Sequence, residues 1–336
     1  MRLEVNAESI SPSVAPEATS GSILLMCPHC GGTLRPLNRT WNIQDAVIRC
    51  ASCDSATECK GGILRALSAE RAAHFSRFIT DYETVRAAEG RGSATVEFYL
   101  GLPYEDISGH NTNQWKIRAR TFRYIEEKII AAIAAVAQRP LNILDIGAGN
   151  CWMSYRLALK NHLPVAVDLL TNDRDGLGSA VHYASILPTL FPRVQSESDH
   201  LPFRSGSFDL VIFNASFHYS EDYHKTLAEA LRCAVVGGTV LIADSPWYSN
   251  EDSGRQMLVE RRAQFTARYG FPSDSIKSLE YLTDRRLQSL ESEFGVKWKI
   301  HKPFYGVHWA LRPLRARLAR RREPSSFNIY ETRVDR

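Results

Sequence analysis

Two Cys-x-x-Cys pairs near the N-terminus carry the first chemical signal in the sequence. Each pair presents two thiolates to one side of a tight turn, and two such turns supply the four soft ligands of a tetrahedral Zn²⁺ site. Because four protein ligands close the coordination sphere, the predicted site is structural; the alternative is four incidental free thiols. His29 and Cys59 lie nearby and are predicted to be bystanders. The four predicted ligands are Cys27, Cys30, Cys50 and Cys53.

A glycine turn at the end of an apolar run carries the second signal. The run 141–146 contains Asp145, and Gly147-Ala-Gly149 follows it directly. Glycines lack side chains, so the backbone of this turn can approach a nucleotide-like ligand closely. The dinucleotide-binding pattern needs a third glycine where Trp152 stands, and a tryptophan there obstructs tight packing beside a pyrophosphate. The sequence therefore disfavours nicotinamide cofactors.

An acidic residue follows the next apolar run. Asp168 comes directly after residues 165–167, where a carboxylate can accept hydrogen bonds from two vicinal hydroxyls. A glycine turn combined with such an acid suits a ligand that has a ribose but no phosphate. S-adenosylmethionine has this chemistry, and it is the predicted cofactor.

Together these segments resemble those of class I S-adenosylmethionine-dependent methyltransferases over residues 140–245. The first motif of that family is acid-x-Gly-x-Gly-x-Gly, and Cys151 stands here in place of its last glycine. The stretch from Glu197 to Asp209 resembles the family segment that contains Leu-Pro-Phe and ends in Ser-Phe-Asp. With Gly237-Gly238, which match the family's glycine turn ahead of the fifth strand, four motifs occur in the family's order, which argues against chance glycine turns.

The resemblance implies further site residues. Glu197 matches the acid that accepts a hydrogen bond from the adenine amino group, with Asp199 as the alternative, and Ser198 offers its backbone N–H to the ring. Gly237-Gly238 match the glycine turn ahead of the fifth strand. The predicted cofactor-binding residues are Asp145, Gly147, Gly149, Asp168, Glu197, Ser198 and Asn214.

Methyl transfer from a sulfonium is an in-line displacement. The protein must chiefly align the acceptor with the methyl group and remove a proton where needed. By the resemblance, residues 214–219 meet the transferring methyl, so His218 is the predicted general base and Tyr219 a second catalytic candidate. His224 and Asp244 are lesser candidates. The segment lacks the two prolines typical of enzymes that methylate exocyclic base amines, so adenine N6 methylation is disfavoured.

Parallel strands are needed to bring these residues to one edge of a sheet. Beyond Pro140, short apolar runs alternate with helical stretches, which predicts a doubly wound α/β sheet with its ligand site at the carboxyl ends of the strands. The predicted fold is a Rossmann-like, seven-stranded methyltransferase sheet preceded by a small zinc ribbon. The strands expected from the sequence are 141–146, 165–167, 210–213, 240–243, 296–300 and 327–334.

Composition and motifs divide the chain of 336 residues into parts. They are a disordered leader (1–21), a zinc ribbon (22–67), a helical connector and substrate cap (68–139) and the methyltransferase domain (140–336). Apolar spacing in the connector predicts helices over 68–88 and 115–137. Four connector residues are candidates for the substrate pocket, with packing or surface roles as the alternative: Tyr104, His110, Trp115 and Arg118.

Composition indicates an ordinary globular protein, with 44% hydrophobic residues, 23% charged residues and a net charge of +4. No apolar run approaches the roughly 20 residues that a bilayer requires, and no signal pattern opens the chain. We therefore expect no transmembrane segment and a cytoplasmic location. Positive charge gathers in 312–322, where six arginines suit RNA phosphates, an anionic membrane surface or an acidic substrate group; a merely solvated helix is the alternative.

Three functions remain open at this stage. A small-molecule or metabolite acceptor is favoured because the Leu-Pro-Phe region is similar to that of quinone- and metabolite-modifying enzymes. A ribosomal RNA base methyltransferase is the alternative, because bacterial ribosomal RNA guanine methyltransferases also join an N-terminal zinc ribbon to this fold, although with different ligand spacing. A non-catalytic interaction protein on a methyltransferase scaffold is the third.

Overall fold

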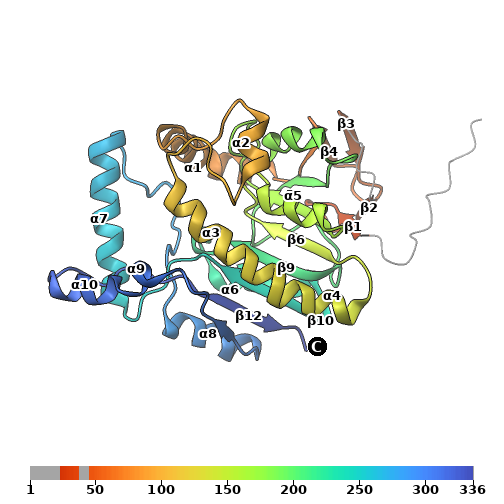
Figure 1. The fold of residues 1–336 in the computed structure, drawn as a ribbon. Coiled ribbons are helices and arrows are strands. Elements are labelled where there is room, and N and C mark those ends of the chain that lie inside the picture. Colours follow the sequence, from red (N-terminus) through yellow and green to blue (C-terminus); the bar gives the residue numbers. More distant parts are fainter. Residues whose placement is uncertain (1–22, 38–44, 336) are drawn as a thin grey trace, which may run out of the picture.

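A large mixed sheet with helices on both faces dominates the protein (Figure 1). The computed structural model describes residues 23–37 and 45–335, without the side chains of residues 35–37. The predicted leader 1–21 lies outside the described residues.

Seven strands form the doubly wound arrangement that the sequence predicts. They are β6 (Asn142–Ile146), β7 (Leu163–Asp168), β8 (Arg193–Gln195), β9 (Phe208–Asn214), β10 (Ala234–Ala243), β11 (Lys299–His301) and β12 (Ile329–Arg333). Their order is β8-β7-β6-β9-β10-β12-β11, with β6 to β10 parallel and β12 antiparallel to both neighbours. Strand order reverses between β6 and β9, and such a switch point opens a crevice at the carboxyl ends of the strands.

Alternate residues of the central strands face two hydrophobic layers. Leu144 and Ile146 of β6 pack in one layer, and Ile143 packs in the other. Every residue of β9 is buried, as expected of a strand that is covered on both faces. The covering helices are α6 (Tyr223–Cys233) and α8 (Asp284–Phe294) in the first layer, and α3 (Thr112–Tyr124) and α5 (Trp152–Leu159) in the second.

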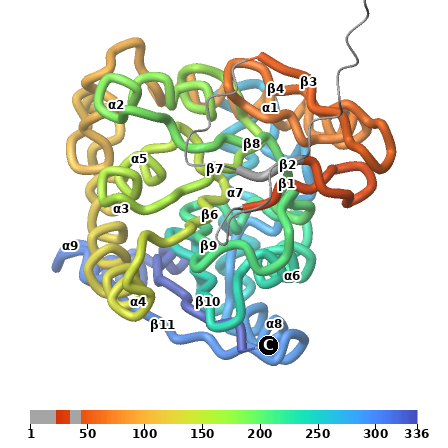
Figure 2. The backbone as a smooth tube through the Cα atoms, turned by 90° about the vertical axis from the view of Figure 1, so that its right-hand side faces the viewer, coloured from red at the N-terminus to blue at the C-terminus, as the bar shows by residue number. Residues whose placement is uncertain are grey.

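The cysteine-bearing segment contributes five short strands. They are β1 (Ile23–Met26), β2 (Thr33–Leu37), β3 (Ala46–Arg49), β4 (Ala56–Lys60) and β5 (Ile63–Arg65). β1 and β2 form a separate antiparallel pair, whereas β3, β4 and β5 extend the main sheet to ten strands (Figure 2). The junction is a parallel pairing of β5 with β8, which sets Leu64 beside Val194 in one buried layer. The predicted ribbon is therefore hydrogen-bonded to the methyltransferase sheet.

The connector is helical, as expected. Helix α1 (Ala69–Ala88) begins at Ser68, whose hydroxyl accepts a hydrogen bond from the backbone N–H of Arg71. Helix α2 (Val96–Gly101) is short. Helix α3 starts at Thr112 and continues through a π-helical turn (Ile125–Ile130) into α4 (Ala131–Ala137), so it closely matches the helix predicted over 115–137.

Three helices of the C-terminal part lie on the same side of the sheet in Figure 1. They are α7 (Glu251–Tyr269), α9 (Val307–Ala310) and α10 (Arg312–Leu318), the last two lying in the connection between β11 and β12. In the described part of the chain, no helix is both long enough and apolar enough to cross a membrane.

Candidate functional site

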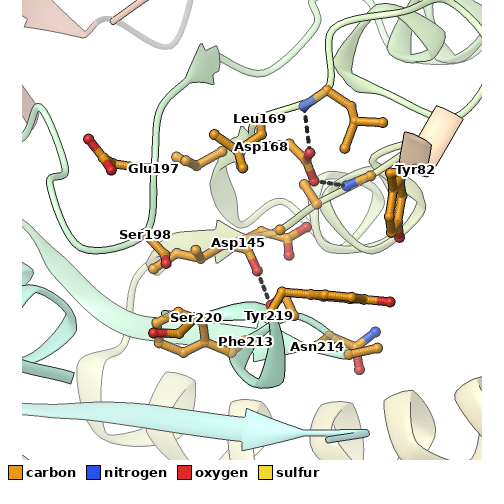
Figure 3. Close-up of a pocket in the computed structure, with 18 of the residues that line it drawn as sticks. Tyr82, Asp145, Asp168, Leu169, Glu197, Ser198, Phe213, Asn214, Tyr219 and Ser220 are labelled. Carbon is orange, nitrogen blue, oxygen red and sulfur yellow. Dashed lines mark hydrogen bonds between the residues drawn. The ribbon is translucent and has the colours of Figure 1, made fainter. Parts of the chain in front are cut away.

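A cavity lies at the carboxyl ends of β6, β7 and β9, beneath side chains of α1 (Figure 3). This is the edge at which the sequence predicts the ligand site. The cavity is lined by all of the residues predicted to bind the cofactor: Asp145, Gly147, Gly149, Asp168, Glu197, Ser198 and Asn214. The structure therefore brings these seven residues together, while their individual roles stay predictions.

The glycine turn has a conformation that other residues adopt with difficulty. Gly147 has a φ of +73°, and a Cβ at this position would lie 2.2 Å from the Cβ of Ser216. The backbone N–H of Gly147 donates a hydrogen bond to the carbonyl of Val167 at 2.8 Å. The positive φ and the close approach of Ser216 explain why a residue without a side chain lines the cavity at this position.

Asp145 and Asp168 are buried carboxylates with different partners. Asp168 accepts hydrogen bonds from the backbone N–H groups of Gly149, at 2.7 Å, and Leu170, at 2.8 Å. Burial nevertheless raises its pKa to about 6. Asp145 accepts a hydrogen bond from the hydroxyl of Ser154 at 2.8 Å, and burial raises its pKa to about 7. Asp145 thus ties α5 to β6, whereas Asp168 braces the glycine turn.

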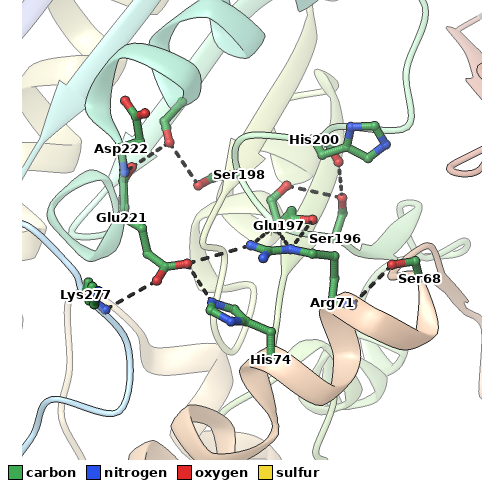
Figure 4. Close-up of polar contacts among 12 residues, drawn as sticks. Ser68, Arg71, His74, Ser196, Glu197, Ser198, His200, Glu221, Asp222 and Lys277 are labelled. Carbon is green, nitrogen blue, oxygen red and sulfur yellow. Dashed lines mark hydrogen bonds and ion pairs between the residues drawn. The ribbon is translucent and has the colours of Figure 1, made fainter.

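Glu197 forms a partly buried ion pair with Arg71 of α1 (Figure 4). The guanidinium of Arg71 contacts its carboxylate at 2.6 to 3.1 Å. Arg71 also lies 3.7 Å from Glu221, which pairs in turn with His74 at 2.8 Å. Asp199 lines the same end of the cavity, and burial together with the charge of Glu197 raises its pKa. The first turn of α1 therefore closes the cavity at the end assigned to adenine.

A second cavity adjoins the first. Ala215 and Tyr219 line both cavities, so the two meet just beyond the carboxyl end of β9. From α1, Phe78 and Tyr82 line both as well, and Tyr82 meets the ring of Tyr219 edge-on at 5.7 Å. His218 and Asp244 line the second cavity, whose volume is about 480 Å³.

His218 and Tyr219, the two catalytic candidates from the sequence, both line the second cavity. Burial lowers the pKa of His218 to about 4, so its imidazole is neutral at physiological pH. Its Nδ1 lies 3.3 Å from the hydroxyl of Ser245. Burial also raises the pKa of Tyr219, which keeps the phenol protonated. The segment therefore offers a phenol where the two cavities meet and a neutral imidazole in the second cavity.

The other candidates divide between the cavities and the rest of the molecule. Arg118 lines both cavities, and its guanidinium lies 4.9 Å from the ring of Trp115. Trp115 itself packs in the core. Tyr104 and His110 line neither of the two cavities. His224 contacts the carboxylate of Glu293 and lines a separate hollow.

Several lining residues escape prediction from the sequence. Phe75, Phe78 and Tyr82 come from α1, more than 60 positions before the glycine turn. Their apolar spacing predicts a helix but not the part of the molecule that the helix covers. The ion pair of Arg86 with Asp175, both in the lining of the first cavity, fixes the C-terminal end of the same helix.

The four predicted zinc ligands form one cluster. Their sulfur atoms all lie within 4.8 Å of one another. Cys27 and Cys53 are 3.8 Å apart, and Cys30 and Cys50 are 3.6 Å apart. A tetrahedral zinc with bonds of about 2.3 Å to sulfur requires a separation of about 3.8 Å, whereas a disulfide requires about 2 Å. The cluster is consistent with the predicted zinc ribbon.

Comparisons with known proteins agree with the resemblance. Residues 144–242 match the family model described as a methyltransferase domain, so this part of the chain carries a methyltransferase domain. A malonyl-[acyl-carrier protein] O-methyltransferase of Geobacter sulfurreducens is 27% identical over 169 residues, which make up 48% of this chain and 53% of that protein. The chain thus spans about half the length of this curated relative.

Solved structures of methyltransferases are more distant. A SAM-dependent methyltransferase of Thermotoga maritima is 14% identical, with a TM-score of 0.42 over 78% of this chain and 98% of that one. An S-adenosylmethionine-dependent methyltransferase of Mesorhizobium loti is 17% identical, with a TM-score of 0.41 over 58% of this chain and 91% of that one. The strand order, rather than these scores, establishes the fold.

Proposed function

We propose that the protein transfers a methyl group from S-adenosylmethionine to a small-molecule acceptor held in the second cavity. The observation that carries this proposal is the meeting of the two cavities at Ala215 and Tyr219. A cofactor in the first cavity and an acceptor in the second would approach each other there, as an in-line displacement requires.

The residues of the first cavity fit this cofactor. Asn214 Oδ1 is buried and has no hydrogen-bond partner in the described part of the chain, so it can accept from an amino group. Asp168 retains lone pairs beyond those used by its two N–H donors, and these suit ribose hydroxyls. Glu197, held by Arg71, would accept from the adenine amino group, with Asp199 as the alternative. When bound, the cofactor supplies an electrophilic methyl group on a sulfonium.

The lining of the second cavity favours a small acceptor with an apolar or aromatic part. Phe265, Trp309 and Phe327 contribute rings to it. Arg118 faces both cavities without an ion pair to any described residue, and burial lowers the pKa of its guanidinium to about 10, so it stays charged. A free cation there suits a carboxylate of the cofactor or of the acceptor. The name of the curated relative, a malonyl-[acyl-carrier protein] O-methyltransferase, supports an acceptor that carries a carboxylate.

His218 is the proposed proton acceptor. Its neutral imidazole can take a proton, but a group with a pKa of about 4 is a weak base. This basicity favours acceptors whose oxygen or nitrogen ionises readily or is already nucleophilic. Tyr219 would orient the acceptor through its protonated hydroxyl rather than act as a base.

We also propose that Cys27, Cys30, Cys50 and Cys53 hold a structural zinc ion. The separations between their sulfur atoms support a tetrahedral site. Backbone N–H groups of His29 and Ser52 donate to the sulfurs of Cys27 and Cys50 at 3.4 Å, which stabilises thiolates.

The first prediction concerns the cofactor. Isothermal calorimetry should detect binding of S-adenosylmethionine, and Asp168→Ala should weaken it about ten- to a hundredfold, the loss expected for a charged hydrogen-bonding group. Asp173→Ala, which alters an acid outside the cavity lining, serves as the control. An affinity that is unchanged in Asp168→Ala would discard the site assignment.

The acceptor class requires a second measurement. Purified protein is given S-adenosylmethionine with a labelled methyl group, together with either total RNA or a small-molecule extract. We expect label only in the small-molecule fraction, and less label with Tyr219→Phe or His218→Gln. Label in RNA would support the ribosomal RNA alternative, and label in neither fraction would favour the non-catalytic scaffold.

A further inference from the structure

The connection between β11 and β12 contains a strongly basic segment that the proposed reaction does not use. We call residues 302–322 the basic arm. It contains seven Lys and Arg residues and no Asp or Glu. It forms α9 and α10, which lie on the same side of the molecule as α7 in Figure 1. A segment whose positive charges are not balanced by acidic residues within it attracts anions.

An apolar stripe runs along the outside of the arm. Val307, Leu311, Leu314 and Leu318 recur at intervals of four, three and four residues, the spacing of one helical face. Val307 lies in α9, Leu311 between the two helices, and Leu314 and Leu318 in α10. Their exposed fractions are 67%, 39%, 55% and 76%, and Phe304 just before them is 71% exposed. Such a stripe normally faces a protein core, so its contact with water indicates a surface that something else covers.

The arginines of the arm divide into two groups. Arg312 stacks on the ring of Trp309 and lines the second cavity, and Arg322 forms an ion pair with Glu260. The remaining four are exposed and form no ion pair with any acid that the structure describes. They are Arg315, Arg317, Arg320 and Arg321.

We propose that the basic arm docks the protein onto an anionic lipid surface. Lipid headgroups would meet the four exposed arginines, and the apolar stripe would enter the boundary between headgroups and acyl chains. RNA would satisfy the arginines but would leave the aliphatic stripe in water. A second copy of the chain would cover the stripe but would bring its own arginines against these. A lipid surface is the one occupant that complements both features.

Docking in this way would also fix where the second cavity, the proposed acceptor site, lies relative to the membrane surface. Trp309 and Arg312 come from the arm, and both line that cavity. Trp309 stacks on Phe327, and Arg312 donates to the carbonyl of Ser325. The inner side of the docked arm is therefore a wall of the cavity, so the cavity would lie close to the membrane surface.

Sedimentation of the full-length protein with vesicles tests this proposal without any methyl transfer. We expect binding to vesicles that contain phosphatidylglycerol, little binding to pure phosphatidylcholine, and weaker binding at high salt. The double variant Leu314→Ser/Leu318→Ser should bind at least about tenfold more weakly, because two leucines no longer enter the apolar region. Arg317→Glu/Arg320→Glu should bind at least about fivefold more weakly, since each basic residue near the surface contributes.

Matched controls separate docking from folding. Val236→Ser changes a side chain that is 73% exposed on β10, and Arg285→Glu reverses a charge that is 84% exposed on α8. Both should bind like the wild type, and all variants should keep the wild-type melting temperature. Equal binding to neutral and anionic vesicles, or no binding to either, would overturn the proposal. So would a wild-type dimer that Leu314→Ser/Leu318→Ser converts to a monomer, or total RNA that binds wild type and this variant equally.

Discussion

Burial is the main cause of the shifted pKa values of titratable residues that line the two cavities. Asp145 and Asp168 have raised pKa values and His218 a lowered one, because burial disfavours the charged form of each group. Hydrogen bonds then separate their roles. Asp168 faces the backbone of the glycine turn, whereas His218 lies beside Ser245 at the second cavity. Residue type alone therefore does not determine which of the two aspartates braces the glycine turn. Nor does it determine which side chain is placed to accept a proton.

A prediction at this scale concerns the stability of the protein in acid. His218 has a pKa of about 4 when folded, against about 6.5 in the unfolded chain. Between these values the unfolded chain binds a proton that the folded protein does not, so stability is lost as the pH falls. From pH 7.5 to pH 5 this loss is about 2 kcal/mol. The free energy of unfolding of His218→Gln should therefore fall by about 2 kcal/mol less than that of the wild type over this range.

Chemical denaturation at the two pH values measures this difference. His110→Gln, which removes an exposed histidine and leaves His218 in place, is the matched control. Parallel pH dependence in wild type and His218→Gln would show that His218 does not titrate as a buried group.

At the scale of elements, helix α1 covers one side of the first cavity. Arg71 near its start pairs with Glu197 after β8, and Arg86 near its end pairs with Asp175 after β7. Between them, Tyr82 lies against Tyr219 after β9. One helix therefore connects the loops that follow three strands of the sheet, so its position and the shape of the cavity are coupled.

Arg71→Gln tests this coupling. The carboxylate of Glu197, 8% exposed, would lose its partner at a cost of about 1 to 2 kcal/mol, a modest value because the Arg71 side chain is 33% exposed. Backbone amides of α1 should exchange hydrogen faster, and affinity for S-adenosylmethionine should fall. Arg77→Gln, which alters a side chain of the same helix that is 70% exposed, is the control. Unchanged exchange in α1 would show that other contacts hold the helix.

At the scale of the whole molecule, the cysteine cluster and the cofactor cavity belong to one sheet. The β3–β4 hairpin, whose turn carries Cys50 and Cys53, pairs through β4 with β5, which in turn pairs with β8. Ser196, Glu197 and Ser198, which line the cavity, follow β8 directly. Backbone hydrogen bonds therefore connect the cysteine cluster to the cavity, so a loss of structure at the cluster can loosen the strand that precedes the cavity residues.

Metal removal tests this connection. Elemental analysis should find about one zinc per chain, the stoichiometry of a four-cysteine site, and Cys30→Ser or a chelator should remove it. Without the metal, amides of β5 and β8 should exchange faster, and those of β10 and β12 should not change. Faster exchange confined to residues 23–60 would show that the two regions are independent, and finding no metal would discard the zinc site.

Local motifs account for what the sequence by itself determines. The glycine turn, Asp168 and the Cys-x-x-Cys pairs each act within a few residues of chain, and buried strands are visible as short apolar runs. The doubly wound sheet, the cavity at the carboxyl ends of its strands and the four-cysteine cluster were predictable for that reason. Strand ends were less certain: β11 is Lys299–His301, against the predicted 296–300.

The tertiary structure alone decides which distant segments meet. Arg71 and Glu197 are 126 positions apart, and neither carries a local signal of the other. The pairing of β5 with β8 depends on the burial of Leu64 and Val194 in one layer, which appears only when the sheet is complete. The apolar stripe of the basic arm has the spacing of a core-facing helix, and only packing leaves it in water. Spacing along the chain fixes the period of an element, whereas contacts between elements fix what each face touches.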